Sequence, residues 1–538
     1  MVAADEVRVW KAANGHGTPF LWSEEGAPMW GYLGTRHPRA SSPTVLSPVW
    51  LRQIFDHPAL IAQMPGVFGL VVVDREQRRT LVACDRLGIQ SVYYTKTHTG
   101  DWMVSTQGMW LLLASGCDGT VNDEAFFSYV GFGYNINATP GLYTGIDRLQ
   151  PGGYLVIQNA RLHTGTYWTP PELTGDLGDD FPGGDVPTLA QYLRAAVETT
   201  LVEKPFLGLS AGKDSLCIAS VLEPDTAMLS GTFGMPGCSD RVQGEALASR
   251  LGWPHGAFNV ASVTEFADRV THLAFYSAGM ATSSYVDFVA FIDQCIPPEA
   301  AYIMGEGGEC VRDFFRMEGG TFMDKLVQVY TTPIEYLRAT LNERFYTALD
   351  DYPTNIIDMA KAAAEQPDDD IFFVHFYRYQ RMFGNFGPRH DVLSALRARV
   401  CPFEDAQFIE ATYRLKTSYY TGSGVHRAII AHARPDLLPF FDHPIQLNQH
   451  IQDWQTRFAN GTGRVVRQLL ADTLPLCEDV FNRAGVLTLC DVNMQSPSRA
   501  IYHLLRLLSF AVARRIVRRE AALRLAAINA ASFRLVLK

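Results

Sequence analysis

The segment from residue 205 to residue 222 constrains the fold of this chain more than any other. Residues 205–209 form a short apolar run typical of a buried strand, and residues 210–215, Ser-Ala-Gly-Lys-Asp-Ser, form a glycine-containing turn. Residues 216–222 then carry apolar side chains at helical spacing. Because strand, glycine turn and helix in this order open parallel, doubly wound domains, we expect an α/β domain here.

The residues around this unit continue the pattern. A helix is expected before it, over 189–202, and a second strand after it, over 227–233. A helix over 242–251 and a third strand over 301–304 follow. From about residue 320 to residue 495 the apolar spacing is mainly helical. This region therefore predicts a sheet flanked by helices and followed by a large helical part.

The first 170 residues have a different pattern of apolar residues. Short apolar runs, rich in β-branched and aromatic residues and broken by Gly, Pro, Asp and Asn, occur at 66–74, 80–84, 91–95 and 153–157. Such runs are typical of a largely antiparallel sheet. Residues 170–185, rich in Pro, Gly and Asp, have the composition of a linker. The predicted organisation is a front domain over 1–170, a linker over 171–187 and a second domain over 188–498.

The composition excludes several classes of protein. The chain has 538 residues, 47% of them hydrophobic, and a formal net charge of −10, which describes a globular protein of more than one domain. No run of about 18 apolar residues is free of charge, and acids near the start stand where a signal peptide has basic residues. Nine scattered cysteines without a CxxC pair argue against a disulfide framework or a structural zinc site. We therefore expect a cytoplasmic protein.

Residues 499–538 form a segment of their own. They hold nine basic residues against one acid, Glu520, a net charge of +8 in a chain that is acidic overall. Leucines and isoleucines at roughly helical spacing predict a basic amphipathic C-terminal helix or helix pair. Three counterparts remain open for it: the protein's own surface, an acidic partner protein, and peripheral contact with an anionic membrane face.

The turn at 210–215 has the features of a phosphate cradle. Its backbone N–H groups and hydroxyls gather at the start of a helix, where the helix dipole favours an anion. The spacing differs from the GxxxxGK[ST] of a kinase-type P-loop, and the acid within the turn, Asp214, suits a magnesium ion held between protein and polyphosphate. The alternative is a strand-to-helix turn without a ligand.

Five sets of residues, in the same order along the chain, resemble the asparagine synthetase B family. The turn at 210–215 looks like the family's SGGxDS pyrophosphate loop, residues 305–309 look like its GEGxDE turn, and residues 402–405 resemble PFLD. Residues 69–94 and 146–154 resemble its glutaminase-like domain. The matches to its acid-rich segment are Asp240, Gln243, Glu245 and Ala248.

The resemblance implies an α+β N-terminal Ntn-hydrolase-like sheet domain followed by an α/β adenine-nucleotide α-hydrolase-like (PP-loop) synthetase domain. It also implies ATP- and Mg²⁺-dependent activation of a carboxylate, loss of pyrophosphate, and transfer of the acyl group to an amine with release of AMP. The residues then expected around ATP are Leu209, Ser210, Ala211, Gly212, Lys213, Asp214, Ser215, Thr232 and Gly305.

The same resemblance suggests which residues carry the chemistry. Asp214 and Glu309 are the expected Mg²⁺ ligands, although Glu309 stands where the family has Asp. Glu306 is expected near the reacting carbonyl, and helix capping is the alternative for both glutamates. The family's late lysine is absent from residues 435–448. The candidates for its role, each of which is alternatively an ordinary surface or core residue, are His426, Arg427 and His443.

The nitrogen source is expected to be the substrate itself. Members of the family that hydrolyse glutamine use an N-terminal cysteine, whereas this chain reads Met1-Val2 and has its first cysteine at Cys84. We therefore expect an inactive glutaminase-like domain and an amine carried by the same molecule as the carboxylate. Two branches of the family that lack the cysteine close rings in this way, the β-lactam synthetases and the lasso peptide cyclases.

A lasso peptide macrolactam cyclase, which joins the N-terminal amine of a core peptide to an Asp or Glu side chain, is the leading hypothesis. Aromatics at 372–383 and 413–420, with Arg378, Arg381 and Lys416, are candidates to line a peptide pocket or else belong to the core. The alternatives are a β-lactam synthetase or other small-molecule amide-forming enzyme, and a non-catalytic scaffold. The expected partners are the precursor peptide and a leader peptidase or leader-binding protein, with no nucleic acid.

Overall fold

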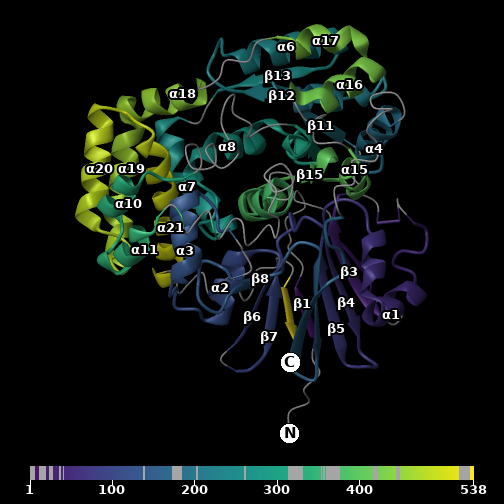
Figure 1. The fold of residues 1–538 in the computed structure, drawn as a ribbon, viewed down its shortest axis with the longest axis horizontal. Coiled ribbons are helices and arrows are strands. Elements are labelled where there is room, and N and C mark those ends of the chain that lie inside the picture. Colours follow the sequence, from purple (N-terminus) through teal and green to yellow (C-terminus); the bar gives the residue numbers. More distant parts are fainter. Residues whose placement is uncertain are drawn as a thin grey trace.

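The computed structural model describes residues 7–10, 20–23, 28–35, 38–39, 42–97, 99–136, 140–171, 185–200, 204–259, 262–312, 331–352, 354, 358, 376–415, 422–443, 449–519 and 534–537. Most of the expected linker, residues 172–184, and residues 520–533 of the C-terminal segment lie outside the described residues. Figure 1 shows a front domain of antiparallel strands, a parallel sheet with helices on the other side of the molecule, and a helical lobe beside both.

Two antiparallel sheets form the front domain. One has the strand order β10-β9-β5-β4-β3-β2 and the other β1-β16-β7-β6-β8. The bounds of the first, in sheet order, are Arg161–Thr166, Gly153–Gln158, Arg79–Cys84, Phe68–Asp74, Met29–Gly34 and Phe20–Ser23. Those of the second are Val7–Trp10, Arg534–Leu537, Trp102–Ser105, Tyr93–Lys96 and Asp147–Arg148. The predicted sheet-rich front domain is confirmed.

Strand β4 shows why this domain contains continuous apolar runs. Val71 and Val73 belong to the core between the two sheets, together with Val104 of the second sheet. Leu70 and Val72 pack on the other face, in the cluster that includes helix α1 (Pro48–Asp56). Because successive side chains alternate across a strand, a strand covered on both faces is apolar at every position.

The second domain contains a five-stranded parallel sheet with the order β13-β12-β11-β14-β15. In that order the strands run His255–Phe258, Leu229–Phe233, Lys204–Gly208, Ala300–Ile303 and Ala398–Val400. The strands predicted at 205–209, 227–233 and 301–304 are confirmed. Strands β13 and β15 escape prediction because four and three residues are too few for a periodic signal.

Helices cover both faces of the parallel sheet. One face shares a hydrophobic cluster with α4, α5, α6 and α16, and the other packs against α8 and α14. Their bounds are Val186–Glu198, Lys213–Val221, Ser239–Leu251, Gly424–Ala433, Val286–Cys295 and Gly387–Leu396. Since all five strands are parallel, their carboxyl ends meet at one edge of the sheet, the place where open α/β sheets bind ligands.

The remaining helices form a lobe that packs on the front domain as well. Its members are α7 (Val263–Tyr276), α10 (Ile334–Thr340), α11 (Tyr346–Asp350), α18 (Gln449–Arg457), α19 (Gly463–Thr473), α20 (Arg483–Gln495) and α21 (Ala500–Arg519). They share one hydrophobic cluster with α2 (Gly108–Ser115) and α3 (Asp123–Phe132) of the front domain. Helix α21 lies between α7 and α3 (Figure 1).

A C-terminal helix is confirmed as α21, but the prediction that it is amphipathic is wrong. Leu504, Leu505, Leu507 and Leu508 have no exposed surface, and neither has Arg514. Arg514 donates to both carboxylate oxygens of Asp479, so its charge is paired inside the protein. The helix lacks a solvent-facing side over this stretch because the lobe and the front domain cover it from opposite sides. Among the described residues, no helix is long and apolar enough to cross a membrane.

Candidate functional site

A cavity of about 550 Å³, here called the strand-edge cavity, opens at the carboxyl edge of the parallel sheet. The turns after β11, β12 and β14 form one side, and residues of α8, α14 and α18 form the other. Of the residues predicted to surround ATP, seven line it: Leu209, Ser210, Gly212, Asp214, Ser215, Thr232 and Gly305. The two that do not are Ala211 and Lys213.

The turn between β11 and α5 brings a helix N-terminus to this cavity. Gly212 is the N-cap of α5, and its N–H donates to Ser210 Oγ at 3.0 Å. The Ala211 N–H donates to Asp240 Oδ1 at 3.0 Å, which ties the turn to the start of α6. Lys213 turns away, with its Nζ 4.5 Å from the centre of the Phe441 ring. The position suits an anion because the N-terminus of a helix carries partial positive charge.

Asp214 and Glu309 lie on either side of one guanidinium group. Arg312 Nη2 is 3.0 Å from Asp214 Oδ2 and 3.3 Å from Glu309 Oε1. His426 of α16 places its Nε2 2.9 Å from Asp214 Oδ1. A Cβ at Gly308 would collide with the Asp214 carboxylate, so the close approach of the two turns requires glycine. The two predicted Mg²⁺ ligands are therefore neighbours that share a cation of the protein.

Burial and Arg312 set the charges in this cluster. Burial alone would raise the pKa of Asp214, but Arg312 and His426 outweigh it and lower that pKa. Burial and the charge of Asp214 raise the pKa of Glu309. Burial lowers the pKa of His426, which favours its neutral form. One carboxylate is thus firmly ionised, and the other gains from any added cation.

A second cluster surrounds Glu306, another residue that lines the cavity. Its carboxylate pairs with Arg389 and lies 2.7 Å from Nε2 of His390. The other ring nitrogen of His390 lies 2.5 Å from Arg399 Nη1. Burial would raise the pKa of Glu306, but Arg389 and His390 outweigh it and lower that pKa. Burial and Arg399 lower the pKa of His390 to about 4. Glu306 is therefore a fixed anion in the wall of the cavity.

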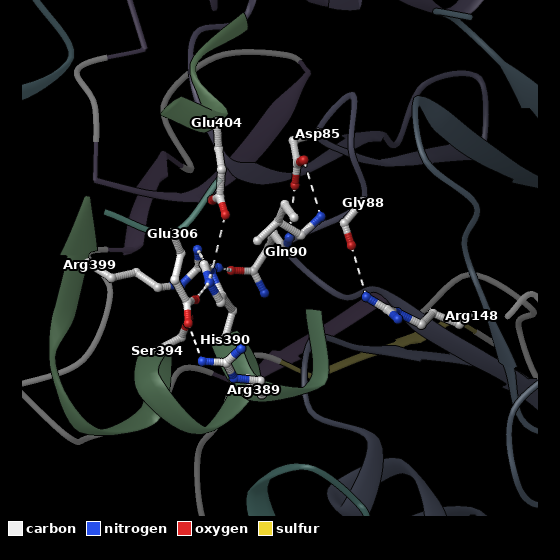
Figure 2. Close-up of polar contacts among 11 residues, drawn as sticks. Asp85, Gly88, Gln90, Arg148, Glu306, Arg389, His390, Ser394, Arg399 and Glu404 are labelled. Carbon is white, nitrogen blue, oxygen red and sulfur yellow. Dashed lines mark hydrogen bonds and ion pairs between the residues drawn. The ribbon is translucent and has the colours of Figure 1, made fainter. Parts of the chain in front are cut away.

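The Glu306 cluster continues into the front domain, as Figure 2 shows. Arg399 Nη2 donates to Gln90 Oε1 at 3.4 Å, and the Gln90 N–H donates to Asp85 Oδ2 at 2.8 Å. Arg148 donates to the Gly88 carbonyl at 2.9 Å and fixes the same front-domain turn (Figure 2). A line of polar contacts therefore connects the turn at 85–90 to the wall of the strand-edge cavity.

His390, Cys401 and Glu404 place ligand-type atoms within 4.8 Å of one another. Both ring nitrogens of His390 already have polar neighbours, as described above, and the Arg399 guanidinium stands beside the group. Burial raises the pKa of Glu404 and of Cys401 well above their usual values. Because metal ligands must be deprotonated and both ring nitrogens of His390 already have partners, this cluster is poorly suited to a metal ion.

Arg427 and His443 are not among the residues that line the strand-edge cavity, and a role for either in place of the family's lysine stays a prediction. Arg427 pairs with Asp442 at the surface, and His443 is exposed. His426 points to Asp214 while Arg427 points away because consecutive residues of a helix are turned by about 100°. Among the three candidates, only His426 contacts the acid cluster.

The predicted aromatic pocket lies largely in the core. Phe376, Tyr377 and Phe383 are buried, and Arg378 has no exposed surface and donates to the Cys310 carbonyl. Residues 372–375 and 416–420, which include Lys416, lie outside the described residues. The described part of residues 372–383 therefore belongs to the core, as the alternative interpretation held. Arg381 is the exception among these residues because it lines a second cavity.

Sequence reasoning missed Arg312, Arg389 and His390. Arg312 had a usable signal, since it stands three residues after Glu309 and reaches it as an i,i+3 pair. Arg389 meets Glu306 across 83 positions of sequence, and nothing in the local pattern joins them. Contacts of this kind depend on how α14 packs on the sheet.

The front half of the chain is similar to a known family of protein domains. Residues 54–168 match the family described as glutamine amidotransferase domain. The front domain is a glutamine amidotransferase-type domain. The match fits the expected asparagine synthetase-like N-terminal domain and covers about a fifth of the chain. No curated protein matches the chain in the corresponding comparison.

The described cysteines of the amidotransferase-type domain are poor candidates for a nucleophile. Cys84 ends β5, is fully buried, and donates to the Gln150 carbonyl at 3.1 Å. Burial raises its pKa, whereas a nucleophilic cysteine needs a lowered one. Cys117, half-buried, lies after α2 and packs against the hydrophobic cluster shared with the helical lobe rather than between the sheets. The void between the sheets is only about 10 Å³ and is lined by glycines, leucines, valines and Thr106.

Proposed function

We propose that this protein is an ATP-dependent, AMP-forming carbon–nitrogen ligase related to asparagine synthetases and lacking glutaminase activity. In this proposal residues 188–498 form a PP-loop synthetase domain. A substrate carboxylate oxygen attacks the α-phosphorus of ATP, pyrophosphate leaves, and an amine of the same molecule then displaces AMP. The substrate is a precursor peptide, and the product is a macrolactam between its N-terminal amine and an Asp or Glu side chain, as in lasso peptide biosynthesis.

The placement of Asp214 and Glu309 carries this proposal. Both carboxylates line a 550 Å³ cavity at the carboxyl edge of a parallel sheet, beside the N-terminus of α5. A helix N-terminus favours phosphate, and paired carboxylates favour a divalent cation, so the two features together suit a metal polyphosphate. A cavity of this size lies within the range of small-molecule and cofactor sites.

The residues present fit Mg²⁺ and a triphosphate. Glu309 Oε2 is buried and has no hydrogen-bond partner among the described residues, so it is left available as a ligand. A Cβ at Gly305 or Gly308 would collide with Asp214, so glycine keeps the acids close together. When bound, Mg²⁺ supplies positive charge that stabilises the departing pyrophosphate. Arg312 adds a fixed positive charge at the same place.

Glu306 is the candidate proton acceptor of the second step. It is ionised, it lines the cavity, and Arg389 and His390 hold its two oxygens in place. An attacking ammonium group has to lose a proton before or as the amide forms, and a fixed carboxylate can accept it. His390 is a positioning residue in this account because its nitrogens contact Glu306 and Arg399.

The absence of a suitable thiol among the described residues of the front domain supports an amine carried by the substrate. A ring-forming amine held in the same molecule needs no separate capture, which removes much of the entropic cost of the second step. The reaction draws on cytoplasmic ATP in this proposal, and a leader peptidase or leader-binding protein delivers the peptide.

The test is pyrophosphate release from ATP in glutamine-free and ammonia-free buffer, with a candidate precursor peptide or with small β-amino acids. We expect Mg²⁺-dependent release with the peptide and a product lighter by one water. Asp214→Asn removes an anionic ligand but keeps its shape, so turnover should fall by orders of magnitude at a nearly unchanged melting temperature. Ser210→Ala removes one hydroxyl and should cost less.

Other outcomes select the alternatives. Turnover with β-amino acids and none with peptides would favour a β-lactam synthetase or related small-molecule enzyme. Glutamate that accumulates in proportion to product would contradict the proposed nitrogen source. No release of pyrophosphate with any substrate, together with no binding of ATP, would mean a non-catalytic scaffold.

A further inference from the structure

A second cavity, here called the arginine cavity, adjoins the strand-edge cavity. It has a volume of about 530 Å³ and shares with the first cavity the residues Ser284, Tyr285 and Arg389. It lies where α3 of the front domain, α14 and the first half of α21 meet. A molecule whose reacting group lies beside Glu306 can therefore extend past Arg389 into this second space.

The charge of the arginine cavity has one sign. Its described lining residues include four arginines and one histidine, and no aspartate or glutamate is among them. The arginines are Arg381, Arg389, Arg499 and Arg506, of which Arg389 also pairs with Glu306. His503 is neutral because burial and the charge of Arg506 lower its pKa to about 3. Lining charges of one sign in a concave site concentrate ligands of the opposite sign. The expected ligand is therefore an anion.

The positive charge of Arg506 is not neutralised by an acidic side chain among the described residues. Its Nη1 donates to the Val130 carbonyl at 2.8 Å and to Thr332 Oγ1 at 2.9 Å, and it forms no ion pair with a described residue. Its Nε is buried without a hydrogen-bond partner in the described part of the chain. A half-buried guanidinium without a carboxylate still carries a desolvation cost, and burial lowers the pKa of Arg506 accordingly. An anionic ligand would relieve this cost.

Aromatic side chains form the rest of the wall. They come from the front domain, the segment before α8, helix α10 and the C-terminal helix, and the rings are those of Phe132, Tyr134, Tyr285, Tyr336 and Tyr502. Arg389 lies over the Tyr285 ring, 3.9 Å from its centre, at the boundary between the two cavities. Such a wall packs against apolar or aromatic parts of a ligand, while the arginines bind its charge.

We propose that the arginine cavity holds the body of the acyl substrate, and that this substrate is a short acidic peptide with a second negative charge besides the carboxylate that is activated. This inference rests on the proposed function, in which the strand-edge cavity holds the carboxylate that is activated. Arg389, in the wall shared by the two cavities, then stands between that carboxylate and the second negative charge. The first carboxylate reaches the α-phosphorus, and the second is bound by Arg499 and Arg506.

The experiment measures binding without ATP, so that it does not depend on turnover. The probe is acetyl-Phe-Asp-Phe-Glu amide, and its uncharged counterpart is acetyl-Phe-Asn-Phe-Gln amide. Calorimetry on the full chain should show at least tenfold tighter binding of the acidic probe, because hydrogen bonds to charged groups are the stronger ones. The difference should shrink as salt is raised.

Two variants and one control locate the binding. Arg506→Gln and Arg499→Gln should each weaken the acidic probe at least fivefold and leave Mg²⁺-ATP binding unchanged. Arg499 is exposed, so its replacement keeps the test valid if Arg506→Gln fails to fold. The matched control is Arg483→Gln, an exposed arginine at the start of α20 that lies outside both cavities and should change nothing.

The result separates this proposal from the proposed function. Equal binding of the two probes, binding of neither, or unchanged affinity in both arginine variants would overturn the acidic-peptide cavity even if the protein binds ATP and releases pyrophosphate. Selective binding of the acidic probe by a protein that never binds ATP would overturn the ligase proposal and leave an anion site in the arginine cavity.

Discussion

Asp391 shows how burial sets the charge state of a single residue between the two domains. Its side chain is 1% exposed, and the hydroxyl of Tyr93, from the front domain, donates to its Oδ2 at 2.7 Å. Burial raises the pKa of Asp391 to about 6, although Arg148 opposes the shift. The ionised form is therefore disfavoured in the folded protein relative to the unfolded chain.

Asp391→Asn tests this assignment through pH. A carboxyl whose pKa is higher in the folded state makes the protein lose stability as pH rises from about 4 to about 6, and the loss persists at pH 7. Asparagine still accepts from Tyr93 but does not titrate, so the variant should gain up to about 3 kcal/mol on the parent between pH 4 and pH 7. Chemical denaturation across this range measures it. The exposed Asp350→Asn is the control, and parallel pH curves for parent and Asp391→Asn would refute the assignment.

At the scale of elements, sequence patterns found what local physics determines and missed what packing determines. Strand β4 and the strand, turn and helix from β11 to α5 were predictable because apolar runs and a glycine turn mark them. Helix α21 was misjudged because its leucines surround it on more than one face and Arg514 is buried and paired with Asp479. The contact of Arg389 with Glu306 was beyond prediction because it joins α14 to a distant turn.

Leu508→Ala measures how far α21 belongs to the core. Leu508 has no exposed surface and packs in the cluster shared by the helical lobe and the front domain, so the free energy of unfolding should fall by about 2–5 kcal/mol. Val492 of α20, which is 52% exposed, is the control, and Val492→Ala should stay within about 0.5 kcal/mol of the parent. Chemical denaturation gives both numbers.

Removal of residues 499–538 extends the same argument. The truncated chain should be insoluble or markedly less stable, because it exposes the cluster that α21 covers. A truncated protein as stable as the parent, which loses only a salt-sensitive association with a partner protein or with anionic vesicles, would show that the segment serves recruitment instead.

At the scale of the whole molecule, the front domain supports the strand-edge cavity. Its turn at 85–90 contacts Arg399, which contacts His390, which contacts Glu306. An amidotransferase-type domain without a suitable described thiol would therefore still have a structural task. The arginine cavity also depends on this arrangement, since Phe132 and Tyr134 of the front domain line it together with residues of α21.

The most direct test of the account is equilibrium binding of ATP to the full chain, measured by calorimetry with and without Mg²⁺. We expect one ATP to bind per chain, tightly only when Mg²⁺ is present, and we expect Asp214→Asn to weaken this binding strongly at an unchanged melting temperature. Arg483→Gln should bind as the parent does. No binding of ATP by the parent, or equal Mg²⁺-dependent binding by Asp214→Asn, would contradict the assignment of this cavity as the site where ATP is used.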